Sequence, residues 1–126
     1  VWLSPILPFI NDNEANLRSI LNDCVEAGVN GIICFGMGMT LRDGNREYFY
    51  EQLDTHFPGL KKRYMETYGT RYQLLSPNHG ALMKLFHQFC DANGIVHNND
   101  QIFKYLNTFE EKNSAAQLSL FSENLT

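Results

Sequence analysis

The stretch "LSPILPFINDNEANLRSIL", residues 3–21, predicts a short apolar strand, a loop punctuated by two prolines, and an amphipathic helix. The prolines interrupt any longer strand because proline cannot donate to a sheet ladder. Asn11 and Asp12 are both favoured N-cap residues, and Glu14 stands three positions after Asn11, as in a capping box. Gly28 supplies the left-handed stop that often ends a helix. Between these limits, apolar residues recur at helical spacing: Leu17, Ile20, Leu21, Cys24 and Val25.

A second apolar run, "GIICFG" at residues 31–36, follows the helix. A short run that is apolar on both faces is typical of a parallel strand, so strand, helix and strand form a βαβ unit with a right-handed crossover. Two parallel strands cannot cover their own edges and faces. We therefore expect the other strands of this sheet to lie upstream of Val1. The predicted fold class is α/β, with residues 1–40 as the terminal βαβ segment.

From Gly38 onward the pattern is expected to stay helical, with four segments that each have a start or stop signal. The expected signals are Pro58, Gly69, Ser76, Pro77, Gly94, and Asn98 with Gln101. The expected apolar faces hold Tyr48, Phe49, Leu53 and Phe57; Leu60, Tyr64 and Tyr68; Leu82, Leu85, Phe86, Phe89 and Cys90; and Ile102, Phe103, Leu106 and Phe109. Residues 41–109 are thus predicted as a helical extension and residues 110–126 as a flexible tail.

The composition limits the class of protein. The 126 residues are enough for one small core, and 44% hydrophobic content is typical of a globular chain. A net charge of −4 argues against a large nucleic-acid surface, and no apolar run is long enough to span a membrane. Three widely spaced cysteines, Cys24, Cys34 and Cys90, are typical of buried thiols in a reducing compartment. We expect a cytoplasmic protein and, because residue 1 is Val, a truncated or processed chain.

The segment "FGMGMTLRDGN", residues 35–45, contains Gly36 and Gly38 directly after a predicted strand. The third glycine of a dinucleotide fingerprint is absent, and no GK[ST] follows to make a P-loop. A phosphate-binding loop is therefore disfavoured. The position is more informative than the glycines, because α/β folds place ligands at the carboxyl ends of parallel strands.

Several segments together point to a family. "PILPFIND", "TLRDGNREYFY", "FPGLKKRY" and "SPNHGALMKLFHQFC" occur in this order. They resemble the C-terminal portion of radical S-adenosylmethionine proteins of the spore photoproduct lyase type. The likeness covers essentially the whole chain. The turn P-x-x-P-x-x-N-D is only fairly specific alone, but it is strongly specific when the TLRxGNR segment follows it.

The resemblance implies a partial (β/α) barrel of which the two predicted strands are the last. Such enzymes cleave S-adenosylmethionine reductively with a [4Fe-4S] cluster, and the resulting 5′-deoxyadenosyl radical abstracts hydrogen from a substrate, which in the lesion-repair relatives is DNA. The cluster is held by a CxxxCxxC loop, which this chain lacks and which its three cysteines cannot replace by spacing. We therefore expect this chain alone to carry neither cluster nor turnover, and its partner to be the N-terminal barrel portion of the same protein.

The resemblance also assigns candidate site residues. In the family, the segment after the last barrel strand lies beside the adenine, and Phe35, Gly36 and Met37 match that position. Ser4 is a candidate for a hydrogen bond to the ribose or the carboxylate of S-adenosylmethionine. Arg42 is a candidate for binding that carboxylate or an anionic substrate, because arginine pairs with such groups in bidentate fashion.

Arg46 shares the two interpretations given to Arg42. Both arginines could bind an anion, and both could equally form salt bridges to nearby Asp43, Glu47 or Glu51. Asn11 and Asp12 could shape the loop at the barrel mouth, but helix capping is the favoured interpretation of that pair. These alternatives depend on side-chain geometry that the pattern does not determine.

Other chemistry-bearing residues favour structural roles. His87 and Cys90 are three apart on one predicted helix without a third ligand nearby, so no metal site is assigned. Cys34 could donate a hydrogen atom into the barrel, but a buried thiol is favoured. One set of aromatic residues could stack bases, although packing between helices is favoured: Tyr48, Phe49, Tyr50, Tyr64, Tyr68 and Tyr72.

The tail carries a second, independent signal. "QLSLF", residues 117–121, matches the pentapeptide QL[SD]LF that binds the bacterial sliding clamp. Gln117 would make the polar anchor, while Leu118, Leu120 and Phe121 would enter apolar pockets. Placement after a polar tether suits a docking peptide. The alternatives are a clamp-binding module and a terminal segment that packs back on the core.

Overall fold

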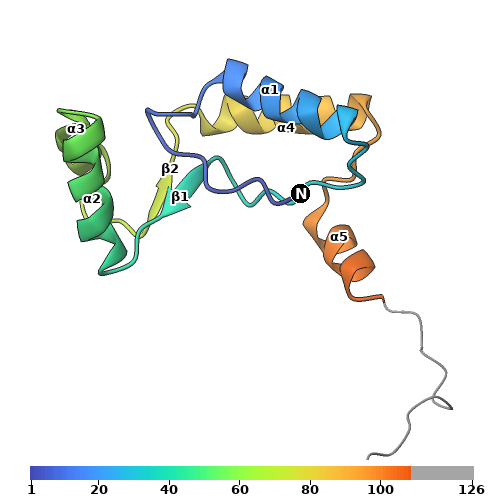
Figure 1. The fold of residues 1–126 in the computed structure, drawn as a ribbon. Helices are drawn as coiled ribbons and strands as arrows, with labels where there is room; N and C mark the ends of the chain where they lie inside the picture. The colour runs from blue at the N-terminus through green and yellow to red at the C-terminus, as the bar shows by residue number, and fades with distance from the viewer. Residues whose placement is uncertain (109–126) are drawn as a thin grey trace, which may run out of the picture.

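The computed structural model describes residues 1–108 and shows a mixed α/β fold that is mostly helical (Figure 1). Its one sheet, within these residues, is a short two-stranded ribbon. In chain order the elements are α1 (Glu14–Glu26), β1 (Gly38–Thr40), α2 (Asn45–His56), α3 (Leu60–Tyr68), β2 (Gln73–Leu75), α4 (His79–Ala92) and α5 (Asn99–Leu106). Nowhere in residues 1–108 does a helix combine the length and the apolar character needed to cross a membrane.

The ribbon of β1 and β2 corrects the expectation that the chain stays helical after Gly38. The two strands are antiparallel, with Gly38 opposite Leu75 and Met39 opposite Leu74. A Cβ atom on Gly38 would lie 2.3 Å from the Leu74 carbonyl oxygen, so only glycine permits this close approach. Three-residue strands are too short to show a two-residue period, which explains why the pattern did not predict them.

Residues 31–33 pair in parallel with one segment on each side, and each pairing is a single isolated β-bridge. Trp2 pairs with Ile33 and Gly31 pairs with Val96, both in parallel. The Leu3 N–H donates to the Ile33 carbonyl (2.9 Å), and the Ile32 N–H donates to the Val96 carbonyl (2.9 Å). The predicted parallel neighbours are therefore present, but the predicted full-length strands are not. Pairing with Val96 had no signal in the sequence.

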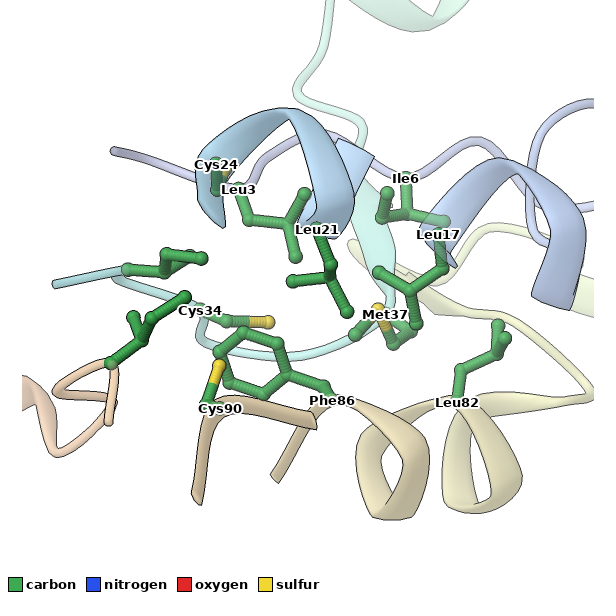
Figure 2. Packing of buried hydrophobic residues seen from close by; sticks show 12 residues of the cluster. Leu3, Ile6, Leu17, Leu21, Cys24, Cys34, Met37, Leu82, Phe86 and Cys90 are labelled. Atoms are coloured by element: carbon green, nitrogen blue, oxygen red, sulfur yellow. The ribbon is translucent and has the colours of Figure 1, made fainter. Parts of the chain in front are cut away.

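A first core lies between α1 and α4, which run side by side (Figure 1). Figure 2 shows how Leu17 and Leu21 of α1 face Phe86 and Cys90 of α4 across the segment that carries Met37. The predicted apolar stripe of α1 is confirmed at Leu17, Leu21 and Cys24, whereas Val25, at the end of the helix, is 40% exposed. We call this group the first core: Leu3, Ile6, Leu17, Leu21, Cys24, Ile32, Cys34, Met37, Leu82, Phe86, Cys90 and Ile95.

A second core lies under the hairpin of α2 and α3, and it is largely aromatic. We define it as Leu41, Leu53, Tyr64, Tyr68 and Leu74, with partly buried neighbours that include Phe9, Phe49 and Tyr50. Two residues expected on the apolar face of α2 are instead exposed: Tyr48 and Phe57. Tyr48 is one position away from Phe49, so it points about 100° around the helix. Phe57 is the C-cap and has already left helical geometry.

The helix boundaries divide into confirmed and corrected predictions. Gly69 ends α3, and Asn98 caps α5 by accepting a hydrogen bond from the Gln101 N–H (3.0 Å). The cap of α1 is Asn13, which accepts from the Asn16 N–H, and neither Asn11 nor Asp12 has this role. Likewise α4 is preceded by Asn78 and not by Ser76. Asp12 and Ser76 instead bond to each other, and the Asn11 side chain bonds to Leu7.

Candidate functional site

A hollow of about 360 Å³ lies where the first segment, the turn after residue 33 and the ribbon meet. Its size is within the range of small-molecule sites. Ser4 and Phe35 lie on one side of it, and Thr40 and Gln73 of the ribbon on the other. We call it the Gly36 hollow, and its lining residues are Ser4, Pro5, Phe35, Gly36, Gly38, Met39, Thr40, Gln73 and Leu75.

Two glycines, Gly36 and Gly38, line the hollow at positions where a side chain would be strained or would meet neighbouring atoms. Gly36 has φ 146°, which L side chains rarely adopt, and a Cβ there would lie 3.2 Å from the His79 imidazole. Gly38 is fixed by the approach of β2. The backbone of this turn is therefore bare, so a ligand could approach its peptide groups directly.

The structure brings three of the five sequence-predicted binding residues into this hollow. Ser4, Phe35 and Gly36 line it, from segments more than thirty positions apart. Met37 does not, because its side chain is fully buried in the first core and its backbone is bonded to α4 and β2 neighbours. Arg42 lies outside the lining, where its guanidinium contacts the Tyr72 hydroxyl (3.4 Å). That contact lowers the pKa of Tyr72.

Arg46 forms none of the predicted salt bridges within residues 1–108, and its role in binding an anion stays a prediction. Its guanidinium donates hydrogen bonds to backbone carbonyls in two segments, one that directly follows α3 and one that directly follows β1. The acceptors are Leu41 (3.2 Å), Gly69 (3.3 Å), Thr70 (3.2 Å) and Arg71 (2.9 Å). Arg46 therefore holds the base of the hairpin together, since a planar five-donor group can satisfy several carbonyls at once.

Three residues of the site were missed by sequence reasoning: Thr40, Gln73 and His79. Thr40 and Gln73 face each other across the ribbon, whose strands gave no periodic signal. His79, the first residue of α4, lies beneath Gly36 and accepts a hydrogen bond from the Met37 N–H at Nδ1 (3.1 Å). Because a backbone N–H can only donate to an unprotonated nitrogen, neutral His79 carries its proton on Nε2.

The loop between Ser4 and α1 is fixed in an unusual conformation. Phe9 has φ 63°, a left-handed value that is uncommon for a bulky side chain. Its ring lies under the Arg63 guanidinium (4.0 Å to the centroid) and edge-on to Tyr64. The Tyr64 hydroxyl donates to the Pro8 carbonyl. Such strain persists where the surroundings over-determine the backbone, and it concentrates at functional sites.

Asn11 and Asp12 shape this loop. Helix capping, the favoured interpretation of this pair, is wrong because Asn13 caps α1. The Asn11 side chain accepts from the Leu7 N–H (2.6 Å). Buried Asp12 accepts a hydrogen bond of 2.5 Å from the Ser76 hydroxyl, which itself accepts from the Asn78 N–H. The carboxylate therefore ties the loop to the start of α4. Asp12 and Ser76, which resemble helix caps in the sequence, instead bond to each other across 64 positions of the chain.

The lining of the Gly36 hollow suits binding better than acid–base chemistry. Its described residues include no Asp, Glu, Lys, Arg, His or Cys. Ser4 and Thr40 offer hydroxyls and Gln73 an amide, while Phe35, Met39 and Leu75 are apolar. A few oriented polar groups on an apolar wall are typical of a site that recognises a small molecule with a polar edge.

The cysteines are buried and do not gather into a metal site. Burial raises the pKa of the Cys24 and Cys34 thiols, and it raises that of Cys90 to about 11. These thiols therefore stay protonated at neutral pH, as is typical of buried structural cysteines. Within residues 1–108, no three His, Cys, Asp or Glu side chains could together hold a metal ion. The favoured interpretation of Cys34 as a buried thiol agrees with this burial.

Next to the hollow lies an exposed aromatic cluster that was not predicted. Phe35 is 64% exposed and Trp2 57%, and their ring centroids are 5.9 Å apart. Phe103 of α5 contacts both rings. By contrast, Tyr64 and Tyr68 are buried in the second core, as the packing interpretation predicted, while Tyr48 and Tyr72 are exposed.

Comparison with known proteins gives distant relatives only. No family model matches the chain, and no solved structure matches it. Over 84 residues, 67% of this chain, it is 31% identical to uncharacterized proteins of Mycobacterium tuberculosis and Mycobacterium bovis. The matched region makes up 24% of each of those proteins, so the chain spans about a quarter of the length of the curated relatives it matches.

Proposed function

We propose that this chain is the C-terminal part of a radical S-adenosylmethionine enzyme of the spore photoproduct lyase type, and that the Gly36 hollow binds the adenosine side of S-adenosylmethionine in the full-length protein. The observation that carries the proposal is the meeting of Ser4, Phe35 and Gly36 around one hollow. The family resemblance independently assigns these three residues to one ligand. Ser4 comes from one segment and the adjacent residues Phe35 and Gly36 from another, and the pairing of Trp2 with Ile33 brings the two segments together.

The backbone at the first segment supports the barrel part of the proposal. Val1 and Leu3 bond to the 31–33 segment, which leaves the Trp2 N–H and carbonyl pointing away from it. Within residues 1–108, no hydrogen bond reaches these two groups. An unpaired parallel edge with an exposed aromatic side chain is suited to a further strand. In a barrel, the preceding strand would occupy that edge.

The residues present fit the nucleoside better than they fit the cluster. A bare glycine turn that a Cβ would fill, an aromatic ring, and hydroxyl and amide groups together suit a base and a ribose. Ser4 would donate to a ribose or carboxylate oxygen, and Phe35 would cover the ring. When bound and reductively cleaved, S-adenosylmethionine supplies the radical chemistry. The three cysteines of this chain are widely spaced and do not supply the CxxxCxxC ligand set of a [4Fe-4S] cluster, which we assign to the N-terminal barrel portion.

The test uses the full-length protein that contains this chain. Phe35→Ala should weaken S-adenosylmethionine binding about tenfold, and Ser4→Ala about fivefold, because they remove a ring contact and one hydrogen bond. Binding is measured by equilibrium dialysis, and 5′-deoxyadenosine by chromatography. Exposed Tyr48, on α2, provides the control Tyr48→Ala, which should bind normally. Equal binding by all three variants, or a full-length sequence without CxxxCxxC, would exclude the proposal.

A second candidate function concerns the tail. The described chain ends its last helix, α5, at Leu106, ahead of "QLSLF", which lies outside the described residues. We propose that this segment recruits the parent enzyme to the bacterial sliding clamp, in keeping with repair of DNA. A titration of this chain with purified clamp should show binding that Phe121→Ala abolishes. Ser119→Ala, at the variable position of the pentapeptide, is the control, and loss of binding in both variants or in neither contradicts the assignment.

A further inference from the structure

Three side chains at the far end of α4 form a cluster that the proposed function does not use. His87 and Asp91 lie one turn apart on α4, and His97 lies on the segment that leads to α5. The Nδ1 atoms of the two histidines are 2.9 Å apart, and His97 Nε2 is 2.6 Å from Asp91 Oδ1. The sequence had offered Cys90 as the companion of His87, but Cys90 points into the first core.

The proton positions in this cluster follow from its contacts. Two ring nitrogens at 2.9 Å share a single proton, because two N–H groups would repel each other. The Nε2–H of His97 donates to the Asp91 carboxylate, so in the neutral ring Nδ1 is a lone pair directed at His87. Histidines that ligate metals commonly donate their other ring N–H to a carboxylate, which fixes the tautomer and raises the basicity of the ligating nitrogen.

We propose that His87 and His97 form a surface site for a divalent transition-metal ion, which replaces the shared proton and is bound by both Nδ1 atoms. Two nitrogens about 2.0–2.1 Å from one ion lie about 2.9 Å apart when they subtend a right angle, and about 3.4 Å apart in a tetrahedron. The two Nδ1 atoms, 2.9 Å apart, are therefore close enough to bind one ion such as Ni²⁺ or Cu²⁺, for which imidazole is a suitable ligand. Water would complete the coordination.

The backbone around the pair is held in place before any ion binds. Val96 donates to the Asn30 carbonyl (3.0 Å) and accepts from the Ile32 N–H, so the residue next to His97 is fixed from both directions. The ring of buried Phe86 contacts both imidazoles, with centroids 5.3 Å from His87 and 5.9 Å from His97. A rigid support of this kind lowers the ordering cost of binding. A bound ion would tie the last turn of α4 to the segment paired with Gly31.

The experiment is a calorimetric titration of this chain, free of any tag, with Ni²⁺ alone at neutral pH. We expect one ion per chain, at least about tenfold weaker binding in Asp91→Asn, and a larger loss in His87→Ala and in His97→Ala, because direct ligands contribute more than the groups that orient them. His56 is an exposed histidine on α2 and provides the control His56→Ala, which should bind like the wild type. The buried, protonated cysteines should not compete.

Each outcome decides the proposal. Far-ultraviolet circular dichroism establishes that the variants fold, so that lost binding cannot reflect lost structure. Absence of Ni²⁺ binding by the wild type would show that the pair is a hydrogen-bonded contact only. Binding that His87→Ala and His97→Ala leave unchanged would place the ion elsewhere and overturn the assignment. None of these results depends on whether the Gly36 hollow binds S-adenosylmethionine.

Discussion

The first core and the second core use different chemistry to hold two halves of one small protein. Between α1 and α4, aliphatic side chains, sulfur atoms and one phenyl ring pack together without polar partners. Under the α2–α3 hairpin, tyrosines are buried and their hydroxyls reach backbone carbonyls, with Tyr64 bonded to Pro8 and Tyr68 to Leu75 (2.6 Å). The first half therefore depends on volume and the second on individual hydrogen bonds.

Removing a buried group therefore has a different cost in each half. In the first core, a lost methylene leaves a void but no unpaired polar atom. In the second, a lost hydroxyl leaves a carbonyl without its partner, which costs more than the bond itself contributes. Substitutions that remove an apolar group from the first core or a hydroxyl from the second can distinguish these two costs.

Phe86→Ala should have the largest effect, because it empties the centre of the first core. Phe86 is fully buried between α1 and α4. We expect the free energy of unfolding to fall by about 3–5 kcal/mol, which approaches the total stability of a small domain. Urea denaturation followed by circular dichroism measures it. Phe57→Ala, at a 45% exposed ring, should cost much less, and equal losses would refute the packing argument.

Gly38→Ala should be nearly as damaging, because it breaks the ribbon that joins the two halves. The added Cβ would meet backbone atoms of Leu74, which cannot move aside as a side chain could. A loss of about 2–4 kcal/mol is expected. Gly80→Ala is the control, since Gly80 lies in α4 with open space around it and alanine favours helices. That variant should be more stable than the wild type, by differential scanning calorimetry.

Tyr64→Phe removes one hydroxyl from the second core and should cost about 1–3 kcal/mol, because the Pro8 carbonyl loses its partner. It should also alter the alkaline limit of stability. Burial raises the pKa of Tyr64 well above its ordinary value near 10. The stability linked to that shift is complete below about pH 10 and is lost as the pH rises further, since the unfolded chain ionises first. The variant should therefore show a shallower decline above pH 10, and exposed Tyr48→Phe should not.

Arg46→Ala should have the smallest of these effects, about 1–2 kcal/mol, because the carbonyls it serves lie near the surface and water can replace it in part. Arg46→Lys should restore little, since a lysine cannot present a planar fork. Arg42→Ala, at an exposed side chain, is the matched control and should leave the thermal midpoint unchanged. If Arg42→Ala and Arg46→Ala shift the midpoint alike, the hairpin does not depend on its guanidinium contacts.

The sequence predicts the residues that helices contribute to both cores, such as Leu17 and Leu21 or Tyr64 and Tyr68, and misses the contacts between distant segments, for a physical reason. Leu17, Leu21 and Cys24 repeat with the period of a helix, so the sequence pattern predicts their burial. Asn98 caps α5 through a contact three residues away, so the sequence also predicts where this helix begins. Contacts such as Arg46 to Thr70 join residues far apart in the chain and leave no period. The lining of the Gly36 hollow shows both cases, because Ser4, Phe35 and Gly36 follow recognisable segments, whereas Gln73 lies on an unpredicted strand.

The walls of the Gly36 hollow come from both halves of the molecule, with Ser4 and Phe35 next to the first core and Thr40 and Gln73 on the ribbon that leads to the second. A molecule seated there would bridge them, and the two halves could then separate only after it departed. A ligand bound in the hollow should therefore slow amide exchange in α2 and α3 as well as in α1. The two cores would then unfold in a single cooperative transition.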